Sequence, residues 1–493
     1  MKRFLVAALA VFAIAAAGAG SAPAPDDRAV AHLLNRIAFG PRPGDVERVR
    51  AIGLDRYVDE QLHPDRVKDD GVRARLADLT LPRPSAREVV ETIELPQIEA
   101  RRDRKQQANG ADAGDSKPPN PLQQRANAIV VELSEQKIVR AVYSERQLQE
   151  VLADFWFNHF NVDARKGRDR FLIGEYERDV IRPRVLGSFR DLLGATAQSP
   201  AMLFYLDNWM SADPAGPQVP VRVGRTFQGR RIGRGDTERA ALQRNRAKKG
   251  LNENYARELM ELHTLGVDGG YTQKDVTEVA RAFTGWTLET PRQGGGFAFD
   301  RRLHDPGPKI VLGHVIKGGG GQSDGEAVLD ILASRPSTAR FIATKLVRRF
   351  VSDAPPPALV DRAAARFRET GGDLREVMRT ILMSPEFRSP DVYAAKVKSP
   401  FEFAVSALRA AGSEVVAGGG TAAPAFDAKG LVRRVRDMGM ALYQCQPPTG
   451  YGDTADAWMN SGALVNRINF ALEVARGDRP LADALGAPEF QRR

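Results

Sequence analysis

Apolar residues recur at helical spacing along most of this chain. In residues 374–382 the apolar side chains stand three or four positions apart, which places them on one face of a helix, and residues 148–156 repeat the pattern. Several such runs follow a Ser or Asp with an acidic or amide residue three positions later, a pairing that often caps a helix start. These pairs are Ser85–Glu88, Ser144–Gln147, Ser323–Glu326 and Asp373–Glu376. The pattern predicts a mainly α, multi-helical globular domain.

Alternating strand patterns and polar insertions are limited to a few segments. Residues 218–227, 296–300 and 309–317 alternate apolar and polar positions, so we expect a few short β-hairpins there. Residues 101–124 are rich in Lys, Arg, Asp, Asn and Pro, and residues 212–249 are rich in Gly, Pro and Arg. Both are expected to be long loop insertions, because they cannot bury apolar surface.

The opening of the chain is typical of a secretory signal peptide. Two basic residues precede an uncharged, mostly apolar run at residues 4–17, and small residues then offer cleavage after Ala19 or Ala24, the second disfavoured by a following proline. The alternative is a membrane anchor, but the run is shorter than the roughly 20 residues that span a bilayer. We therefore expect residues 1–24 to be removed and the protein to be periplasmic or secreted.

The remaining chain is expected to form one helical domain, residues 25–476, followed by a C-terminal tail, residues 477–493. No internal repeat divides it, and no later stretch is long and apolar enough to cross a membrane.

Cysteine content and charge narrow the chemistry. With Cys445 as the only cysteine, the chain forms no intramolecular disulfide and no cysteine-rich zinc or iron–sulfur site. In an exported protein a formal net charge of +10 fits an anionic polymer, lipid headgroups or an acidic protein better than nucleic acid. Ten basic residues lie between Arg222 and Lys249, among them Arg230 and Arg231. That segment is either a solvated loop or a basic arm that binds an anionic partner.

The densest polar motif lies in residues 250–263. If it is a helix, Asn254, Glu258 and Glu261 share one face, and Glu258 stands at the boundary with the apolar face. A carboxylate there needs a partner such as an arginine, a cation or a substrate. The alternative is a surface helix with an Arg257–Glu261 pair.

Two histidines are candidates for chemistry. His159 falls on the helix face of Leu152 and Phe155, so it is expected to be partly buried, either as a core residue or as a ligand. His304 and Asp305 precede a turn, where they would bind a metal, shuttle a proton or simply form an Asx-type turn. Metal-hydrolase, nucleophile-elbow and phosphate-loop signatures are missing from the sequence.

A series of motifs runs along the chain in a characteristic order. These are His32–Gly40, Phe155–Phe160, Gly250–Gly266, Tyr271–Val276, Phe283–Trp286, His304-Asp305 with Lys309 and Leu312-Gly313, Ser384–Phe387 and Trp458–Ser461. Their order and spacing, from about Arg28 to Arg476, resemble the bacterial family called domain of unknown function 1800.

The resemblance implies export, a helical fold and an exported partner from the family called domain of unknown function 1501. The recurring polar positions of the family would map to Asn158, His159, Asn254, Glu258, His304 and Asp305. The resemblance implies no catalytic role for any of them.

Two hypotheses follow for the function. In the first, the chain is a metal-assisted, hydrolase-like enzyme: His159, Glu258, His304 and Asp305 bind one divalent transition metal, with Glu258, His304 and Asp305 also catalytic. Asn158, Asn254, Arg230 and Arg231 would bind the substrate or partner. In the second, the chain is a non-enzymatic helical scaffold that binds an exported partner or an anionic surface polymer, and the polar motifs are caps and buried networks.

Overall fold

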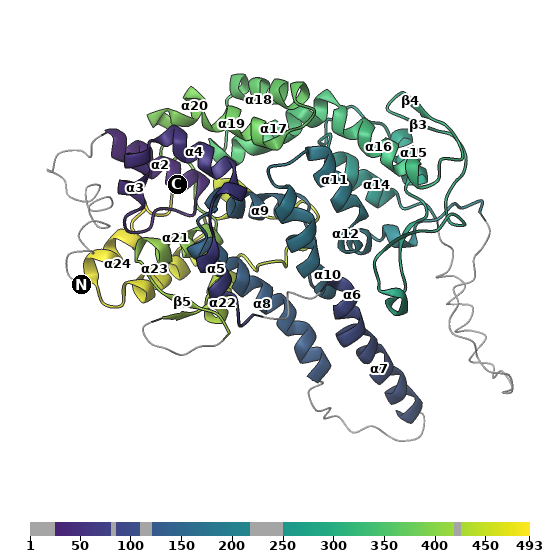
Figure 1. The fold of residues 1–493 in the computed structure, drawn as a ribbon, viewed down its shortest axis with the longest axis horizontal. Coiled ribbons are helices and arrows are strands. Elements are labelled where there is room, and N and C mark those ends of the chain that lie inside the picture. Colours follow the sequence, from purple (N-terminus) through teal and green to yellow (C-terminus); the bar gives the residue numbers. More distant parts are fainter. Residues whose placement is uncertain (1–24, 80–84, 109–120, 217–249, 419–424) are drawn as a thin grey trace.

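The structure is a computed structural model that describes residues 25–79, 85–108, 121–216, 250–418 and 425–493 (Figure 1). This part of the chain is mainly helical, which confirms the predicted fold class. The helices of the first half are α2 (Pro25–Ile37), α3 (Asp45–Ile52), α4 (Leu54–Leu62), α5 (Asp70–Arg75), α6 (Ala86–Val89), α7 (Leu95–Ala108), α8 (Pro121–Tyr143), α9 (Gln147–His159), α10 (Asp169–Glu175), α11 (Phe189–Gln198) and α12 (Pro200–Tyr205).

The second half continues with helices of similar length. They are α14 (Glu253–Glu261), α15 (Gln273–Ala282), α16 (Gln322–Ser334), α17 (Pro336–Phe350), α18 (Pro357–Glu369), α19 (Leu374–Leu382), α20 (Pro385–Arg388), α21 (Pro400–Ala410), α22 (Ala428–Asp437), α23 (Ser461–Ala475) and α24 (Arg479–Gly486). Single turns of tighter or wider helix join them: η1 (Pro64–Arg66), η2 (Val90–Glu94), η3 (Tyr176–Ile181), η4 (Arg182–Arg184), η5 (Asn208–Met210), η6 (Pro291–Gln293), η7 (Pro390–Val392) and η8 (Ala455–Ala457).

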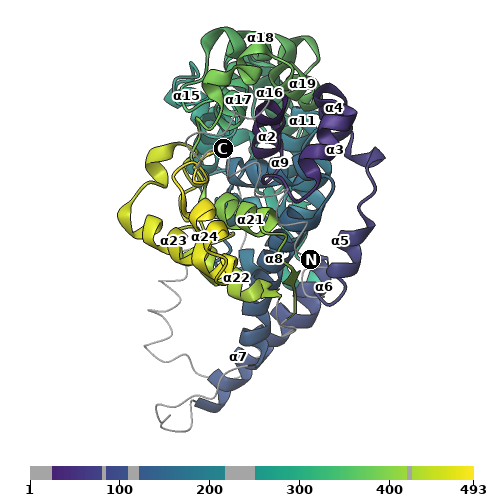
Figure 2. The ribbon, with the colours of Figure 1, turned by 90° about the vertical axis from the view of Figure 1, so that its left-hand side faces the viewer.

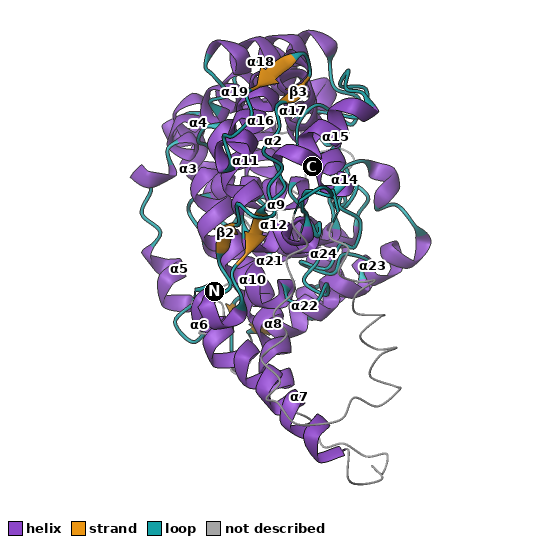
Figure 3. Cartoon of the chain, turned by 90° about the vertical axis from the view of Figure 1, so that its right-hand side faces the viewer, coloured by secondary structure: helices purple, strands orange, loops and turns teal. Residues whose placement is uncertain are grey.

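The described strands are short and pair only in twos, as the orange pieces in Figure 3 show. They are β1 (Trp286–Leu288) antiparallel to β2 (Phe297–Phe299), β3 (Lys309–Val311) antiparallel to β4 (His314–Ile316), and β5 (Val415–Val416) parallel to β6 (Phe426–Asp427). The hairpin expected at residues 309–317 is confirmed, and residues 296–300 hold β2. The one expected at residues 218–227 lies outside the described residues.

The predicted helix starts are correct in part. Asp373 accepts hydrogen bonds from the first backbone N–H groups of α19, and Ser85 and Glu88 bond reciprocally before α6. Ser144, however, donates its hydroxyl to Asp69, and Ser323 lies inside α16. A tertiary contact therefore determines where Ser144 lies, whereas Ser323 makes a local bond to the Gly320 carbonyl oxygen just inside a helix that begins one residue earlier.

Most of the buried apolar side chains form one continuous core. Helices α9 and α21 lie within it and are buried on most faces, while α8 packs against α21 and α22 (Figure 2). Helices α7 and the start of α8 project from this body in Figure 1, with a small separate cluster at their base: Val89, Ile93, Ile129 and Phe171. The two helices that position the candidate site, α9 and α17, are therefore held by the main core.

Two expected boundaries differ from the structure. Residues 101–108 continue α7 and residues 121–124 begin α8, so the first insertion is helical at both ends, with residues 109–120 outside the described part. The expected tail instead forms α24 and a last segment that pairs with residues 396–398, through a bridge between Val397 and Arg492. Pairing of the backbone and burial of the Arg493 side chain hold this end against the core.

Candidate functional site: a pocket between α9 and α17

His159 lies at the end of α9 with one ring nitrogen unpaired. It is 2 % exposed, and its Nε2 lies 3.1 Å from the carbonyl oxygen of His263, which can only accept a hydrogen bond. Burial, and secondarily the charge of Lys345, lowers the pKa of His159 well below its ordinary value, so the ring is neutral with its proton on Nε2. Its Nδ1 is buried and has no hydrogen-bond partner among the described residues. That atom is an acceptor that lacks a donor.

Aromatic rings surround this imidazole, which explains its burial. Phe160 and Trp156 present edge-to-face rings at centroid distances of 4.5 and 5.4 Å, and Phe341 of α17 lies at 6.2 Å. The expected burial of His159 on the face of Phe155 is therefore confirmed.

Asn158 fixes the loop that forms one wall of the pocket. Its side-chain Nδ2 donates to the carbonyl oxygen of Tyr451 at 2.9 Å, and its Oδ1 accepts from the Tyr451 N–H at 2.7 Å. The preceding Gly450 has a φ of +72°, and a Cβ there would lie 2.2 Å from the Asn158 carbonyl oxygen, so no larger residue fits without a shift. Both hydrogen-bonding ends of Asn158 are thus used to position the protein's own loop.

The loop, α9, α17 and the start of α21 line a partly open pocket of about 250 Å³. Its lining includes Asn158 and His159 from α9, Lys345 from α17, and Asp453 and Trp458 from the loop. Asn158 and His159, two of the site residues that the sequence predicts, therefore line the same pocket. Both belong to the motif Phe155–Phe160.

Two cations of α17 line the pocket one turn apart. Neither Lys345 nor Arg348 has an ion-pair partner within the described chain, and the Arg348 Nε is buried without a hydrogen bond. The described contact of the Lys345 ammonium is with the Phe341 ring, 5.5 Å from its centroid. Burial lowers the pKa of Lys345 to about 8, against a smaller upward effect of Asp453.

The carboxylates around the cavity have other partners. Asp154 pairs with Lys137 at 2.7 Å, and Glu402 pairs with Arg349, while Asp453 lies 3.9 Å from Arg349. The pocket therefore contains positive charge that the neighbouring acids do not fully balance.

His304 lies in a different, internally paired network. Its Nδ1 lies 2.8 Å from the Thr284 carbonyl oxygen and its Nε2 lies 3.1 Å from the Asp324 carboxylate. Lys309, with no exposed side chain, donates to the same Asp324 oxygen at 2.6 Å. Both ring nitrogens are thus occupied by protein groups.

Asp305 is likewise engaged. Its two oxygens accept from Arg281, at 2.7 Å and 3.1 Å, and one also accepts from the Gly307 N–H. Arg281 and Gly307 lower the pKa of Asp305 despite its partial burial, so it remains an anion paired within the protein. The alternative reading of an Asx-type turn matches this Asp305–Gly307 bond.

Glu258 is half-buried on α14 and has no hydrogen-bond or ion-pair partner among the described residues. Burial, and secondarily Glu261, raises its pKa. Asn254 is exposed. The alternative Arg257–Glu261 pair does not form, because Arg257 donates to Gln273 and Glu261 accepts from Tyr271.

The four expected metal ligands do not form one centre. All of them lie in the described part of the chain, where no three His, Cys, Asp or Glu side chains are grouped so as to hold an ion. The prediction of a single metal at His159, Glu258, His304 and Asp305 therefore gains no support, because two of the four are already paired internally. Arg230 and Arg231 lie outside the described residues.

Sequence reasoning missed Lys345, Arg348 and Asp453. A signal for the first two was present: basic residues interrupt the apolar pattern of residues 342–350 three positions apart. Nothing local distinguishes Asp453, because long-range contacts such as the Asn158–Tyr451 bonds bring its loop to α9.

The geometry and the motifs define a helical protein with a polar pocket between α9 and α17. The family model described as Protein of unknown function (DUF1800) matches residues 32–492. The chain belongs to this family, as its motifs predict. No curated protein and no solved structure matches the chain. Among the described helices, none combines the length and the apolar character that crossing a membrane would need.

Proposed function

We propose that this chain binds a small organic anion, a carboxylate or a phosphate ester, in the pocket between α9 and α17. The observation that carries the proposal is the Lys345 ammonium, which lines the cavity without an ion-pair or hydrogen-bond partner in the described chain. A cation withdrawn from water is costly unless an opposite charge meets it. Arg348, one turn further along α17, adds a second positive charge to the pocket.

His159 indicates a second feature of the ligand, a hydrogen-bond donor. Its unpaired Nδ1 accepts a hydrogen bond, so a ligand with a hydroxyl or amine next to its acidic group satisfies both residues. Because burial lowers the pKa of His159 well below its ordinary value, its role near neutral pH is that of a hydrogen-bond acceptor. The cavity is smaller than the roughly 300–1,000 Å³ of sites for drug-sized molecules, which favours a small metabolite-sized anion.

The first test is calorimetric titration with lactate, citrate and glycerol 3-phosphate. We expect wild-type protein to bind at least one of them near neutral pH. Its affinity should fall as the pH rises through about 8, because Lys345 then loses its charge. Lys345→Met should reduce the affinity at least tenfold and leave the melting temperature unchanged or higher, because it removes an unpaired, partly buried charge.

The control is Lys274→Met, which alters an exposed lysine of α15 and should change neither property. Anion binding that survives Lys345→Met would contradict the proposal. So would failure of all three anions to bind, together with amine labelling that gives Lys345 an ordinary lysine pKa.

We also propose that the protein is exported, because residues 1–24, which lie outside the described part, carry the basic, apolar and small-residue pattern of a secretory signal peptide. The protein recovered from the periplasm or medium should have an intact mass that corresponds to cleavage after Ala19 or Ala24. Retention of residues 1–17 in membrane-bound material would instead identify an anchor.

Other hypotheses from the sequence stay predictions. They are a metal-assisted hydrolase activity, anion binding by the basic arm with Arg230 and Arg231, binding of an anionic polymer, and binding of an exported partner family. The same exported sample, purified without chelators, allows elemental analysis. Stoichiometric transition metal that is lost in Glu258→Ala or His304→Ala would favour the metal-assisted enzyme over the anion-binding pocket.

A further inference from the structure

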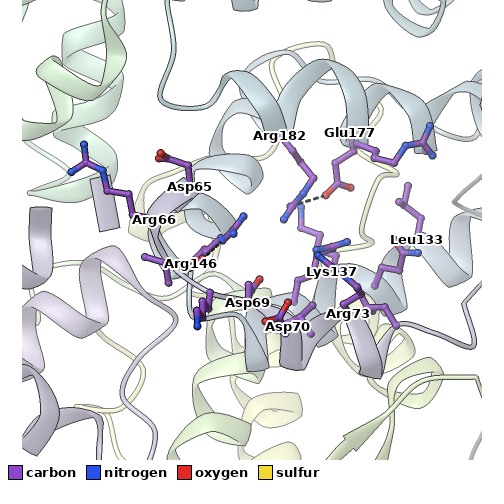
Figure 4. Close-up of a pocket in the computed structure, with 18 residues that line it drawn as sticks. Asp65, Arg66, Asp69, Asp70, Arg73, Leu133, Lys137, Arg146, Glu177 and Arg182 are labelled. Atoms are coloured by element: carbon purple, nitrogen blue, oxygen red, sulfur yellow. Dashed lines mark hydrogen bonds and ion pairs between the residues drawn. The ribbon is translucent and has the colours of Figure 1, made fainter. Parts of the chain in front are cut away.

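A second, more open cleft of about 510 Å³ lies on the other side of the Lys137–Asp154 ion pair. Lys137 lines this cleft and Asp154 lines the pocket of His159. Its walls come from residues 65–76, from α8, from the start of α9 and from η3 and η4 (Figure 4). Eight basic and four acidic side chains line it. Three of these basic side chains pair with acids outside the lining, Lys137 with Asp154, Arg178 with Asp179 and Arg182 with Glu150, so the excess of positive charge is smaller than the lining alone implies. The cleft lies in a part of the chain that the motif series does not include.

The two less exposed acids of the cleft are occupied. Asp69 accepts the Ser144 hydroxyl and the Glu145 N–H, both at 2.9 Å. Glu177 pairs with Arg182 and accepts the Tyr443 hydroxyl. The other two, at positions 65 and 70, are exposed at the mouth, where water screens their charge.

Two arginines have no carboxylate partner in the described chain. Arg140 of α8 is half-buried and forms no ion pair in the described chain; burial, and secondly the nearby Arg182, lowers its pKa against the opposing effect of Glu150, Glu177 and Asp69. Arg146 donates its Nε to the Val67 carbonyl oxygen at 2.8 Å, which fixes the side chain and leaves its terminal nitrogens available. In Figure 4, Arg146 and Arg182 lie around the middle of the cleft, beside Lys137.

We propose that this cleft is a binding site for a multivalent anion, with two or more phosphate or carboxylate groups close together. Fixed guanidinium groups suit such a ligand because each can donate two parallel hydrogen bonds to one phosphate or carboxylate. The site is separate from the small-anion pocket, because Lys137 and Asp154 neutralise each other between them. Its open shape also suits the end of an anionic chain.

The test uses pyrophosphate and trigalacturonate, which supply phosphate and carboxylate versions of the same charge pattern. Wild-type protein should bind at least one, more weakly at high salt than at low salt. Arg140→Met should weaken the binding about tenfold, as expected for one charge-assisted contact. The melting temperature of the free variant should be unchanged or higher, because an unbalanced cation is removed.

A second variant, Arg146→Met, should cause a similar loss of affinity. Arg292→Met alters an exposed arginine outside the cleft, and Lys345→Met alters the other pocket; both should keep the affinity. The stronger of the two probes identifies the acid group of the natural ligand. Unchanged affinity in Arg140→Met and Arg146→Met would overturn the proposal, as would the absence of binding by both probes.

Discussion

Glu402→Gln should lower the free energy of unfolding by about 3–5 kcal/mol at neutral pH. Glu402 is buried at the start of α21, where it pairs with Arg349 and with Arg493 at 3.2 Å. Its second oxygen accepts the Ser399 N–H at 2.8 Å. An amide would leave the buried Arg493 guanidinium without an ion pair and Arg349 with only Asp453 at 3.9 Å, which costs far more than the loss of one surface ion pair.

Glu402 should also make the stability of the fold sensitive to acid. Burial alone would raise the pKa of Glu402, but the neighbouring arginines lower that pKa from its ordinary value of 4.5 to about 2. The stabilisation is fully present above pH 4.5 and is lost as the pH falls from there to about 2, because the unfolded chain then binds the proton more readily. The loss amounts to about 3 kcal/mol, from 1.36 kcal/mol for each pKa unit.

Denaturant titration at a series of pH values measures both effects. Glu402→Gln should be less stable at pH 7 and should lack this part of the acid dependence. Glu414→Gln is the matched control, because Glu414 is exposed and pairs with Arg75 only at 3.6 Å. Equal stability of the two variants at pH 7 would show that the Glu402 cluster does not hold α17, α21 and the chain end together.

Asp324→Asn should also cost about 3–5 kcal/mol, because it leaves the Lys309 ammonium buried without a counter-ion. It also weakens the contact that orients His304 through Nε2. Asp330→Asn is the control, since Asp330 lies on the same helix, α16, but is exposed and pairs with Arg190. Thermal and chemical unfolding of the two variants measures the difference.

A double variant separates structure from chemistry at this network. Lys309→Met with Asp324→Leu removes both buried charges and should recover most of the stability lost in Asp324→Asn. If Asp324→Asn instead keeps full stability, the network is not a structural element, and a functional role for His304 regains weight.

The periodicity of apolar residues was sufficient to predict the helical class and much of the helix pattern. The capping residues Ser85 and Asp373 were correctly placed because their hydrogen bonds span three residues. Ser144 was not, because its hydroxyl contacts Asp69, which is distant in the sequence. Local hydrogen bonds can be read from spacing, whereas long-range ones cannot.

The candidate site shows the same division. The motif around His159 predicted its burial, and Asn158 was among the expected site residues, but its partner Tyr451 lies 293 positions away. Lys345 gained significance only when the fold placed it beside His159 without a carboxylate of its own. Glu258 and His304 shared a predicted role because both stand in polar motifs, yet they belong to different environments in the structure.

The sequence by itself determined the helical class, the family and the burial of His159, because each depends on the order and spacing of neighbouring residues. The tertiary structure alone decided which charges are paired. Asp305 pairs with Arg281 and Asp324 pairs with Lys309, while Lys345 and Arg140 form no ion pair within the described chain. The physical reason is that the cost of a buried charge depends on what lies within a few ångströms in space, and folding brings those neighbours from distant parts of the chain.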